Sequence, residues 1–312
     1  MIGIIALPRR DHYLVRVWSQ LRLRLTAVIV TICLLCFSSP LQVAQQQKHL
    51  SGVDSKIDWL KTAMTGPETE VALSQEKDHR FLLHSIEIDK ASGGATGLHL
   101  VWIVLPRGSF SLSINLIDKI GPANDLYTIA TSSGALLTLN GGFYMLRQGR
   151  APAPLGLLRQ NGKTLSPLAT FSTGAVLVSN DQHEVEIIPI KRFSGGGGVH
   201  NALQSKPLLI EDGRLSIRPN KSDGLFNRVA IGVTENGDLC IAGAFKDDTQ
   251  AITLYDFGRF LSLLRAKKGL PLRTVLNLDG ATDAHMFLPA TGLQLGYPGT
   301  NYVPDVITIS RK

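Results

Sequence analysis

Two carboxylates and a histidine follow one apolar run of the chain. Asp279, Asp283 and His285 lie within residues 277–285, and Gly280 comes directly after the first carboxylate. The preceding apolar residues predict a buried strand, and the glycine predicts a tight turn at its end. Acids and an imidazole at such a strand end are suited to moving protons to or from a substrate. The same pattern also fits an ordinary loop with solvated acids.

A second apolar run, residues 135–139, ends in a similar turn of Asn140, Gly141 and Gly142, with Tyr144 close behind. Paired glycines let the backbone approach a ligand closely and can direct successive N–H groups at an anion. Alternatively, the two glycines only shape the turn. We expect the two polar turns to form opposite walls of one pocket.

Two further polar residues stand at the starts of predicted strands. Arg228 precedes the apolar run 229–234, and Gln204 opens another strand. An arginine in this position can clamp a phosphate with two parallel hydrogen bonds, or can be a simple rim charge. The chain lacks a serine-hydrolase turn signature and the spacing of a metal site. We therefore expect no serine nucleophile, no bound metal and no cofactor, and leave a divalent cation open.

Local turn signals predict a largely antiparallel sheet to carry these residues. Asn-Gly and Asp-Gly pairs between apolar runs favour tight hairpins because both turn residues then adopt positive φ. Signals of this kind stand at Asn161-Gly162, Asn180-Asp181, Asp212-Gly213 and Asn236-Gly237. Further strands are predicted at residues 81–89, 98–105, 109–116 and 303–310.

Few helices accompany these strands. Apolar residues three and four positions apart predict an amphipathic helix over 253–267, ended by Gly269, and a short helix is expected at 125–132. Strands and hairpins without a repeated βαβ unit favour the α+β class. We expect a single domain with a large antiparallel or mixed sheet, several hairpins and few packed helices.

The composition argues against a nucleic-acid partner. The chain has 312 residues and a formal charge of +7. Residues 1–44 contain five arginines and one acid, a net charge of +4, which leaves +3 for the rest of the chain. The high isoelectric point is therefore largely a property of this leader and not of a basic binding face.

The leader itself resembles an export signal. An arginine-rich stretch precedes the apolar run 25–37, which is short for a membrane span. Gln42 makes the cleavage site poor, so residues 1–44 are predicted as either a cleaved signal peptide or an uncleaved anchor in the inner membrane. Either alternative places the remainder in the periplasm or another extracytoplasmic space. Residues 45–80 are predicted as a linker and residues 81–312 as the domain.

Five short motifs occur in the order seen in phosphodiester glycosidase domains. The resemblance covers roughly residues 81–312 and identifies the chain as similar to bacterial exported members of that family. It implies cleavage of a sugar-1-phosphodiester, with a sugar phosphate or glycan as substrate. The motifs are Asn140 to Tyr144, Pro154 to Leu157, Lys206 to Gly213, Arg228 to Gly232 and Asn277 to Gly280.

The resemblance implies that Asn140, Arg228 and Asp279 line the pocket. Combined with the local patterns, it gives two sets of expected site residues. The expected catalytic residues are Asp279, Asn140, His285 and Asp283. The expected substrate- or phosphate-binding residues are Arg228, Gly141, Gly142, Tyr144, Gln204, Gly280 and Thr282.

One departure from the family pattern leaves two functions open. The family commonly continues Asp-Gly-Gly-x-Ser, whereas this chain has Ala281 and Asp283 at the third and fifth positions. Alanine restricts positive φ, and an added carboxylate repels a phosphate unless a cation offsets it. The first hypothesis is an exported hydrolase of envelope glycans or glycolipids. The alternative is a non-catalytic module that binds an envelope glycan or phosphate, and a ligand-free scaffold is the third reading.

Overall fold

The computed structural model describes residues 58–73, 81–88, 97–117, 125–147, 150–171, 173–195, 198–297 and 303–312. Asp58–Lys312 forms one compact unit. The predicted leader and the first part of the predicted linker lie outside the described residues. Within the described part, no helix is both long and apolar enough to span a bilayer.

The largest sheet contains the strands that deliver most of the polar turns. Every described pair of neighbouring strands in it is antiparallel. In spatial order the eight strands are β1 (Thr69–Ala72), β2 (Leu82–Ile88), β3 (Leu98–Leu105), β16 (Leu239–Phe245), β15 (Arg228–Thr234), β17 (Leu272–Asn277), β13 (Leu208–Glu211) and β14 (Arg214–Leu215).

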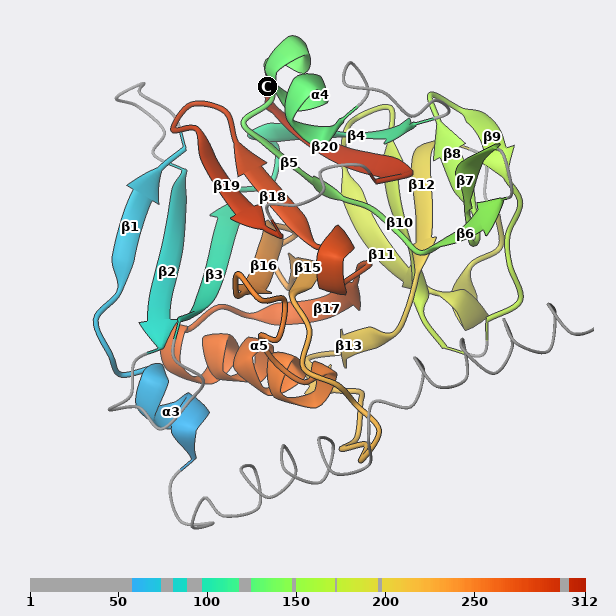
Figure 1. The fold of residues 1–312 in the computed structure, drawn as a ribbon. Coiled ribbons are helices and arrows are strands. Elements are labelled where there is room, and N and C mark those ends of the chain that lie inside the picture. Colours follow the sequence, from blue (N-terminus) through green and yellow to red (C-terminus); the bar gives the residue numbers. More distant parts are fainter. Residues whose placement is uncertain are drawn as a thin grey trace, which may run out of the picture. The chain divides into compact units, whose positions relative to one another are not determined.

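Two five-stranded antiparallel sheets and one isolated ribbon complete the strands (Figure 1). The second sheet has the order β19 (Leu293–Gly296), β18 (His285–Leu288), β5 (Leu137–Asn140), β20 (Asp305–Arg311) and β4 (Phe110–Leu116). The third has the order β11 (Val185–Pro189), β10 (Ala175–Asn180), β12 (Val199–Ser205), β8 (Leu158–Gln160) and β9 (Lys163–Ser166). The ribbon pairs β6 (Tyr144–Arg147) with β7 (Arg150–Pro154).

The three larger sheets share one apolar core. Alternation along β15 shows how the sequence builds it, because Val229, Ile231 and Val233 enter this core while Ala230 packs into a second cluster on the opposite face. Residues from every sheet meet in the shared core, among them Ile103, Leu276, Leu139, Ile307 and Leu177. A core of this size holds the strand ends that carry the polar turns in fixed positions.

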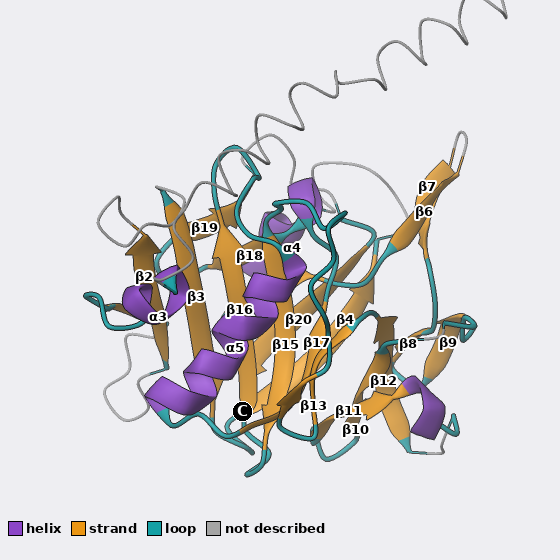
Figure 2. Ribbon diagram, turned by 90° about the horizontal axis from the view of Figure 1, so that it is seen from below, coloured by secondary structure: helices purple, strands orange, loops and turns teal. Residues whose placement is uncertain are grey.

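The helix α5 (Leu254–Lys268) covers the opposite face of the largest sheet (Figure 2). Its N-cap Thr253 accepts a hydrogen bond from the Asp256 N–H, and Gly269 ends it with a φ of 65°. The predicted helix at 253–267 is therefore confirmed. The short helix predicted at 125–132 is confirmed as α4 (Leu126–Ser133).

The turn signals also produce the predicted hairpins, which join β8 to β9, β10 to β11, β13 to β14 and β15 to β16. At the first of these, Asn161 and Gly162 have φ values of 50° and 78°. Asp212 and Gly213 have φ values of 47° and 75° at the third. Positive φ at both positions is the geometry that favours asparagine or aspartate followed by glycine. The α+β class, with mostly antiparallel sheets and few helices, is confirmed.

The folded unit begins earlier than the sequence predicted. Residues 45–80 were expected as a linker, yet they contain the short helix α3 (Trp59–Ala63) and β1. Leu60 and Met64 are buried in the cluster beneath α5, and β1 pairs with β2. The short amphipathic stretch 57–61 does indicate a helix, but the polar residues around it favoured a linker, and β1 is too short to stand out locally. Tertiary packing on the sheet fixes them instead.

Candidate active site

The two polar turns predicted from the sequence meet in the structure. The Asp279 N–H donates to the Gly141 carbonyl at 3.1 Å, so the turn after β17 contacts the turn after β5. The Ala281 N–H donates to the Asn227 carbonyl at 3.0 Å, just before β15 begins. The Gly141 N–H donates to the Asp305 carbonyl at 3.0 Å, at the start of β20. Four strand ends therefore converge on one place.

Asn140 holds this convergence together. Its side chain is 1% exposed, and its amide nitrogen donates to the Asp279 carbonyl at 3.0 Å and to the Gly141 carbonyl at 3.3 Å. Its side-chain oxygen accepts the His285 N–H at 3.0 Å. With its donors and its acceptor engaged by the protein, Asn140 acts by positioning the turns and not by touching a ligand.

Asp279 is a half-buried carboxyl with one strong partner. The Gly280 N–H donates to its Oδ1 at 2.8 Å. Burial raises the pKa of Asp279 to about 7, the nearby charge of Asp283 raises it further, and the Gly280 N–H opposes both. A carboxyl that titrates near neutral pH can both take up and release a proton under physiological conditions.

A third carboxyl, Asp305, belongs to the site and was not predicted from the sequence. Its Oδ1 accepts the Gly142 N–H at 2.8 Å, whereas its buried Oδ2 has no hydrogen-bond partner within the described part of the chain. Burial raises the pKa of Asp305 to about 7, with a further contribution from the charge of Asp279. The sequence gives only a weak indication that Asp305 is a site residue, because this acid simply stands between Pro304 and the apolar run of the closing strand.

The glycines of the first turn hold Asp305 and do not present free amides. Both N–H groups, those of Gly141 and Gly142, donate to Asp305. A Cβ atom at Gly141 would lie 1.7 Å from Oδ1 of Asp305, so only glycine fits there. The expectation that these two N–H groups bind an anion is therefore wrong for the structure as described, because the backbone carbonyl of Asp305 already accepts the Gly141 N–H and its carboxyl Oδ1 accepts the Gly142 N–H.

Asp283 lies at the far end of the second turn, in a single 3-10 turn of residues Ala281–Asp283. The Tyr144 hydroxyl donates to its Oδ2 at 3.0 Å, which connects the turn to the β6–β7 ribbon. Burial raises the pKa of Asp283, and the Tyr144 hydrogen bond opposes this. Thr282, on the same turn, is exposed.

His285 is fully buried directly after this turn. Its Nδ1 lies 3.3 Å from the Tyr127 hydroxyl, and its Nε2 has no hydrogen-bond partner among the described residues. Burial lowers the pKa of His285 to about 4, although the backbone of Thr282 favours the charged form. The imidazole is therefore neutral at neutral pH, which favours a positioning role over that of a general acid.

Arg228 packs beside the second turn. Its Nη2 donates to Asp223 Oδ1 at 3.1 Å and to the Gly224 carbonyl at 3.2 Å, while its buried Nε has no partner. A Cβ atom at Gly280 would lie 3.8 Å from its Nη1, so one edge of the guanidinium faces the turn that holds Asp279. Burial lowers the pKa of Arg228, and Asp223 opposes this.

Gln204 lies behind the first turn. Its side-chain oxygen accepts the N–H groups of Leu157 and Ala169, both at 2.9 Å, and its nitrogen donates to the Ala169 carbonyl at 2.8 Å. A Cβ atom at Gly142 would lie 2.9 Å from the Gln204 carbonyl, so the two segments are in close contact. These bonds support the loops around the site.

The departure from the family pattern has a clear backbone consequence. Gly280 is extended, with a φ of −134°, whereas Ala281 adopts a φ of 59°. The turn thus keeps a left-handed residue at the third position although the side chain there is alanine. A non-glycine residue in this region costs about 1 kcal/mol.

The described residues that could hold a metal ion are not those of the site. Glu68, Glu70 and His84 bring their ligand atoms within 4.8 Å of one another. Glu68 already binds the Lys268 ammonium and lies 2.6 Å from Nδ1 of His84. An internal ion pair of this kind accounts for the cluster without a metal.

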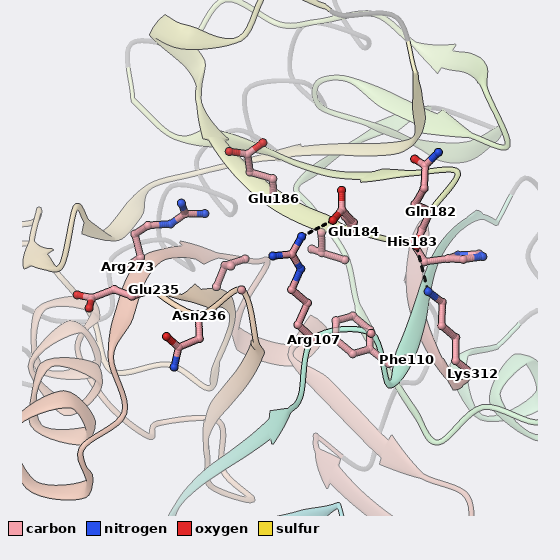
Figure 3. Close-up of a pocket in the computed structure, with 14 residues that line it drawn as sticks. Arg107, Phe110, Gln182, His183, Glu184, Glu186, Glu235, Asn236, Arg273 and Lys312 are labelled. Atoms are coloured by element: carbon pink, nitrogen blue, oxygen red, sulfur yellow. Dashed lines mark hydrogen bonds and ion pairs between the residues drawn. The ribbon is translucent and has the colours of Figure 1, made fainter.

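A pocket lies at the other end of β15 and β17 (Figure 3). It includes Arg107, Glu184 and Arg273, and none of the predicted site residues lines it. Arg107 forms an ion pair with Glu184, and Lys312 donates to the Gln182 carbonyl at 3.0 Å. Glu235, another acid of this pocket, forms an ion pair with Arg265 outside it.

Comparisons with known proteins agree with the fold and with the family. The chain aligns with the zebrafish N-acetylglucosamine-1-phosphodiester alpha-N-acetylglucosaminidase catalytic domain, auto-inhibited by its pro-peptide, at 14% identity and a TM-score of 0.51, over 79% of this chain and 83% of that one. It aligns with a hypothetical protein from Synechocystis at 16% identity and a TM-score of 0.54, over 80% of this chain and 64% of that one. No curated protein sequence matches.

The sequence profile named "Phosphodiester glycosidase" matches residues 133–310, more than half of the chain. This range contains both polar turns, Arg228 and Asp305. The chain therefore belongs to the phosphodiester glycosidase family.

Proposed function

We propose that the protein is a hydrolase that cleaves a sugar-1-phosphodiester between the anomeric carbon and the phosphate oxygen. The observation that carries the proposal is Asp279, a half-buried carboxyl whose pKa is raised to about 7 at the meeting point of four strand ends. Membership of the phosphodiester glycosidase family supports the same reaction class. A perturbed carboxyl at convergent strand ends is a frequent mark of an active site.

In the proposed reaction, Asp279 takes a proton from water as the water oxygen attacks the anomeric carbon. The bond from that carbon to the phosphate oxygen breaks, and a phosphate monoester leaves with the bonding electrons. A phosphate leaves readily without a strong general acid, so one carboxylate suffices where ordinary glycosidases use two. Nη1 of Arg228, which lies beside Gly280, is the guanidinium nitrogen proposed to hold the phosphate.

The raised pKa values also explain how an acidic site could accept an anionic substrate. Asp305 has a pKa of about 7, so around neutral pH a substantial fraction of this carboxyl is protonated, while the ionised fraction of Asp279 serves as the base. The site then carries less negative charge than three ionised acids would give it. This reduces the repulsion that Asp283 introduces.

Hydrolysis in water enriched in heavy oxygen tests the proposed bond cleavage. We expect release of free sugar from a sugar-1-phosphodiester, with the heavy oxygen in the sugar and none in the phosphate monoester. Label in the phosphate would indicate cleavage at phosphorus and would contradict the proposal. Binding without turnover across a panel of such diesters would support the binding module instead.

A charge-removing substitution tests the role of Asp279. Asp279→Asn keeps the shape and the Gly280 hydrogen bond but cannot take up a proton, so we expect a loss of about 1,000-fold in kcat/KM. Glu186→Gln, an exposed acid of the pocket in Figure 3, is the matched control and should retain activity within about twofold. Equal activity of the two variants would refute the assignment.

We also propose that the protein is exported and acts outside the cytoplasm on envelope glycans or glycolipids. The arginine-rich stretch and apolar run within residues 1–44 motivate this proposal. Mass spectrometry of the N-terminus after cell fractionation distinguishes a cleaved signal from a retained anchor. Recovery of the full-length chain in the cytoplasmic fraction would contradict export.

A further inference from the structure

Arg228, the residue proposed to hold the phosphate, is fixed by the short segment directly before it. Its Nη2 donates to Oδ1 of Asp223 at 3.1 Å and to the Gly224 carbonyl at 3.2 Å. The guanidinium carbon lies over the ring of Phe226, 5.2 Å from the ring centroid. Nη1 is left without a described partner and, unlike Nε, is not buried. The segment therefore leaves Nη1 free beside the turn at Gly280.

Asp223 connects this guanidinium to the helix α5. Its Oδ1 accepts from Arg228, and its Oδ2 accepts the Tyr255 N–H at 3.2 Å, in the first turn of the helix. The side chains of Asp223 and Arg228 are only 14% and 12% exposed. Because charges shielded from solvent are screened little by salt, the carboxylate of Asp223 acts on any ion that Arg228 binds.

The proposed reaction changes the charge of the phosphate at this position. A phosphodiester carries one negative charge. The phosphate monoester that remains after cleavage has a second pKa of about 6, so it carries nearly two negative charges at about pH 7.5. The Coulomb energy of a ligand is proportional to its charge. A fixed charge beside the phosphate therefore acts about twice as strongly on the product as on the substrate.

We propose that Asp223 makes the site selective for a singly charged phosphodiester over a doubly charged phosphate monoester, because its carboxylate cancels the charge of the guanidinium that it holds. The inference rests on the proposed function, since it concerns the same phosphate position. Two hydrogen bonds and the width of the guanidinium place the carboxylate about 7 Å from a phosphate bound at Nη1. This distance is within a Debye length, so Asp223 weakens retention of the product at Arg228.

Two small phosphates test this inference without a sugar. Dimethyl phosphate is singly charged and methyl phosphate is almost doubly charged at about pH 7.5, where phosphorus NMR titration measures both dissociation constants. We expect the wild type to bind dimethyl phosphate at least as tightly as methyl phosphate. Asp223→Asn should shift the ratio of the two constants toward methyl phosphate by about 10-fold, because it removes the charge and keeps the size of the side chain.

Asp223→Glu separates the effect of charge from that of position. It disturbs the bonds to Arg228 and Tyr255 but keeps the negative charge, so it should weaken both phosphates alike and leave the ratio within about twofold of the wild type. Glu186→Gln removes an exposed acid at the other end of the strands and should also leave the ratio unchanged. Equal shifts in Asp223→Asn and Asp223→Glu would indicate a purely structural role and would overturn the inference.

Turnover of a sugar-1-phosphodiester is measured separately, so the inference and the proposed function can fail independently. A ratio that Asp223→Asn leaves unchanged would overturn the inference even if the wild type hydrolyses the diester. Preference of the wild type for methyl phosphate, or binding of neither phosphate, would overturn it without any variant. Absence of turnover would refute the proposed function, whereas the expected shift in the ratio would still support the role of Asp223 at Arg228.

Discussion

The two ends of β15 and β17 carry opposite arrangements of charge. At one end, the exposed side chains of Arg107 and Glu184 form an ion pair, and the hydrogen bond from Arg107 lowers the pKa of Glu184. At the other end, Asp279 and Asp305 are buried without a cationic hydrogen-bond partner among the described residues, and burial raises both pKa values to about 7. The ends lie about 20 Å apart, the length of a seven-residue strand.

This difference shows which structural feature is the better indicator of a catalytic site. The end with the Arg107–Glu184 ion pair forms a pocket (Figure 3). The exposed charges of this ion pair bind each other, so they contribute little free energy to the binding of a substrate. The other end maintains buried acids at a cost in stability. Groups held in a costly state are better candidates for catalysis than groups that merely line a cavity.

The largest expected difference between the two ends is in kcat/KM when one arginine at each end is replaced. Arg228→Lys should lower kcat/KM for a sugar-1-phosphodiester by about 10- to 100-fold, because an ammonium group cannot bind Asp223, the Gly224 carbonyl and a phosphate in the fixed geometry of the planar guanidinium. Arg107→Lys should change it by no more than about twofold. Steady-state kinetics on one substrate checks both, and equal losses would remove the distinction between the ends.

The next largest expected difference between the two ends is in how pH affects the free energy of unfolding. Asp305 has a folded pKa of about 7, against an ordinary aspartate value of 3.8, so its contribution to stability is present at low pH and lost as pH rises through 7. Asp305→Asn keeps an oxygen for the Gly142 N–H and removes the ionisation. Relative to the variant, the wild type should lose of the order of 1–2 kcal/mol in free energy of unfolding between about pH 4 and pH 8.

For Glu184→Gln, at the end with the Arg107–Glu184 ion pair, the free energy of unfolding of the wild type relative to the variant should change with pH in the opposite direction. The pKa of Glu184 is lowered in the folded state, so its contribution is present above the unfolded pKa and lost as pH falls. Urea unfolding at several pH values measures both variants against the wild type. The same sign for both would mean that the raised pKa of Asp305 is wrong.

A smaller effect is expected on the pH–rate profile. The charge of Asp283 raises the pKa of Asp279, so Asp283→Asn should lower that pKa and move the acidic limb of kcat/KM to lower pH. The variant keeps an oxygen for the Tyr144 hydroxyl. Glu186→Gln should leave the limb in place. A limb that moves to higher pH would show that Asp279 is not the titrating base.

The smallest effect concerns the backbone of the turn. Ala281→Gly should raise the free energy of unfolding by about 0.5 kcal/mol, because the relief at a φ of 59° exceeds the added entropy of the unfolded chain. Ala169→Gly, at a position outside the left-handed region, should lower it by about 0.5–1 kcal/mol. Thermal unfolding of both variants checks the sign, and destabilisation by Ala281→Gly would contradict the turn geometry.

Local rules predicted much of the fold and part of the site. The hairpins and α5 follow from turn residues, caps and periodicity, which act within a few positions. Asn140 and Asp279 were found because each stands at the end of an apolar run. Their contact with each other also agrees with the prediction of two facing turns.

The remaining features depend on distant pairing. Asp305 enters the site because β20 pairs with β5, and nothing near Asp305 in the sequence indicates that partner. The same pairing gives the glycines an acceptor inside the protein, so their N–H groups are not free. A short amphipathic helix near α3 could be predicted locally, whereas its place in the folded unit depends on the packing of Leu60 and Met64 in the cluster with α5.

The strand pairing that brings in Asp305 also governs how the protein folds. β20 lies between β4 and β5, and the bond from the Asn115 side chain to the Thr308 hydroxyl joins residues 193 positions apart. Contacts of such long sequence separation form slowly because the intervening chain must first be ordered. We therefore expect the pairing of β20 with β5 to form late in refolding, and a chain without this pairing lacks Asp305 at the candidate site.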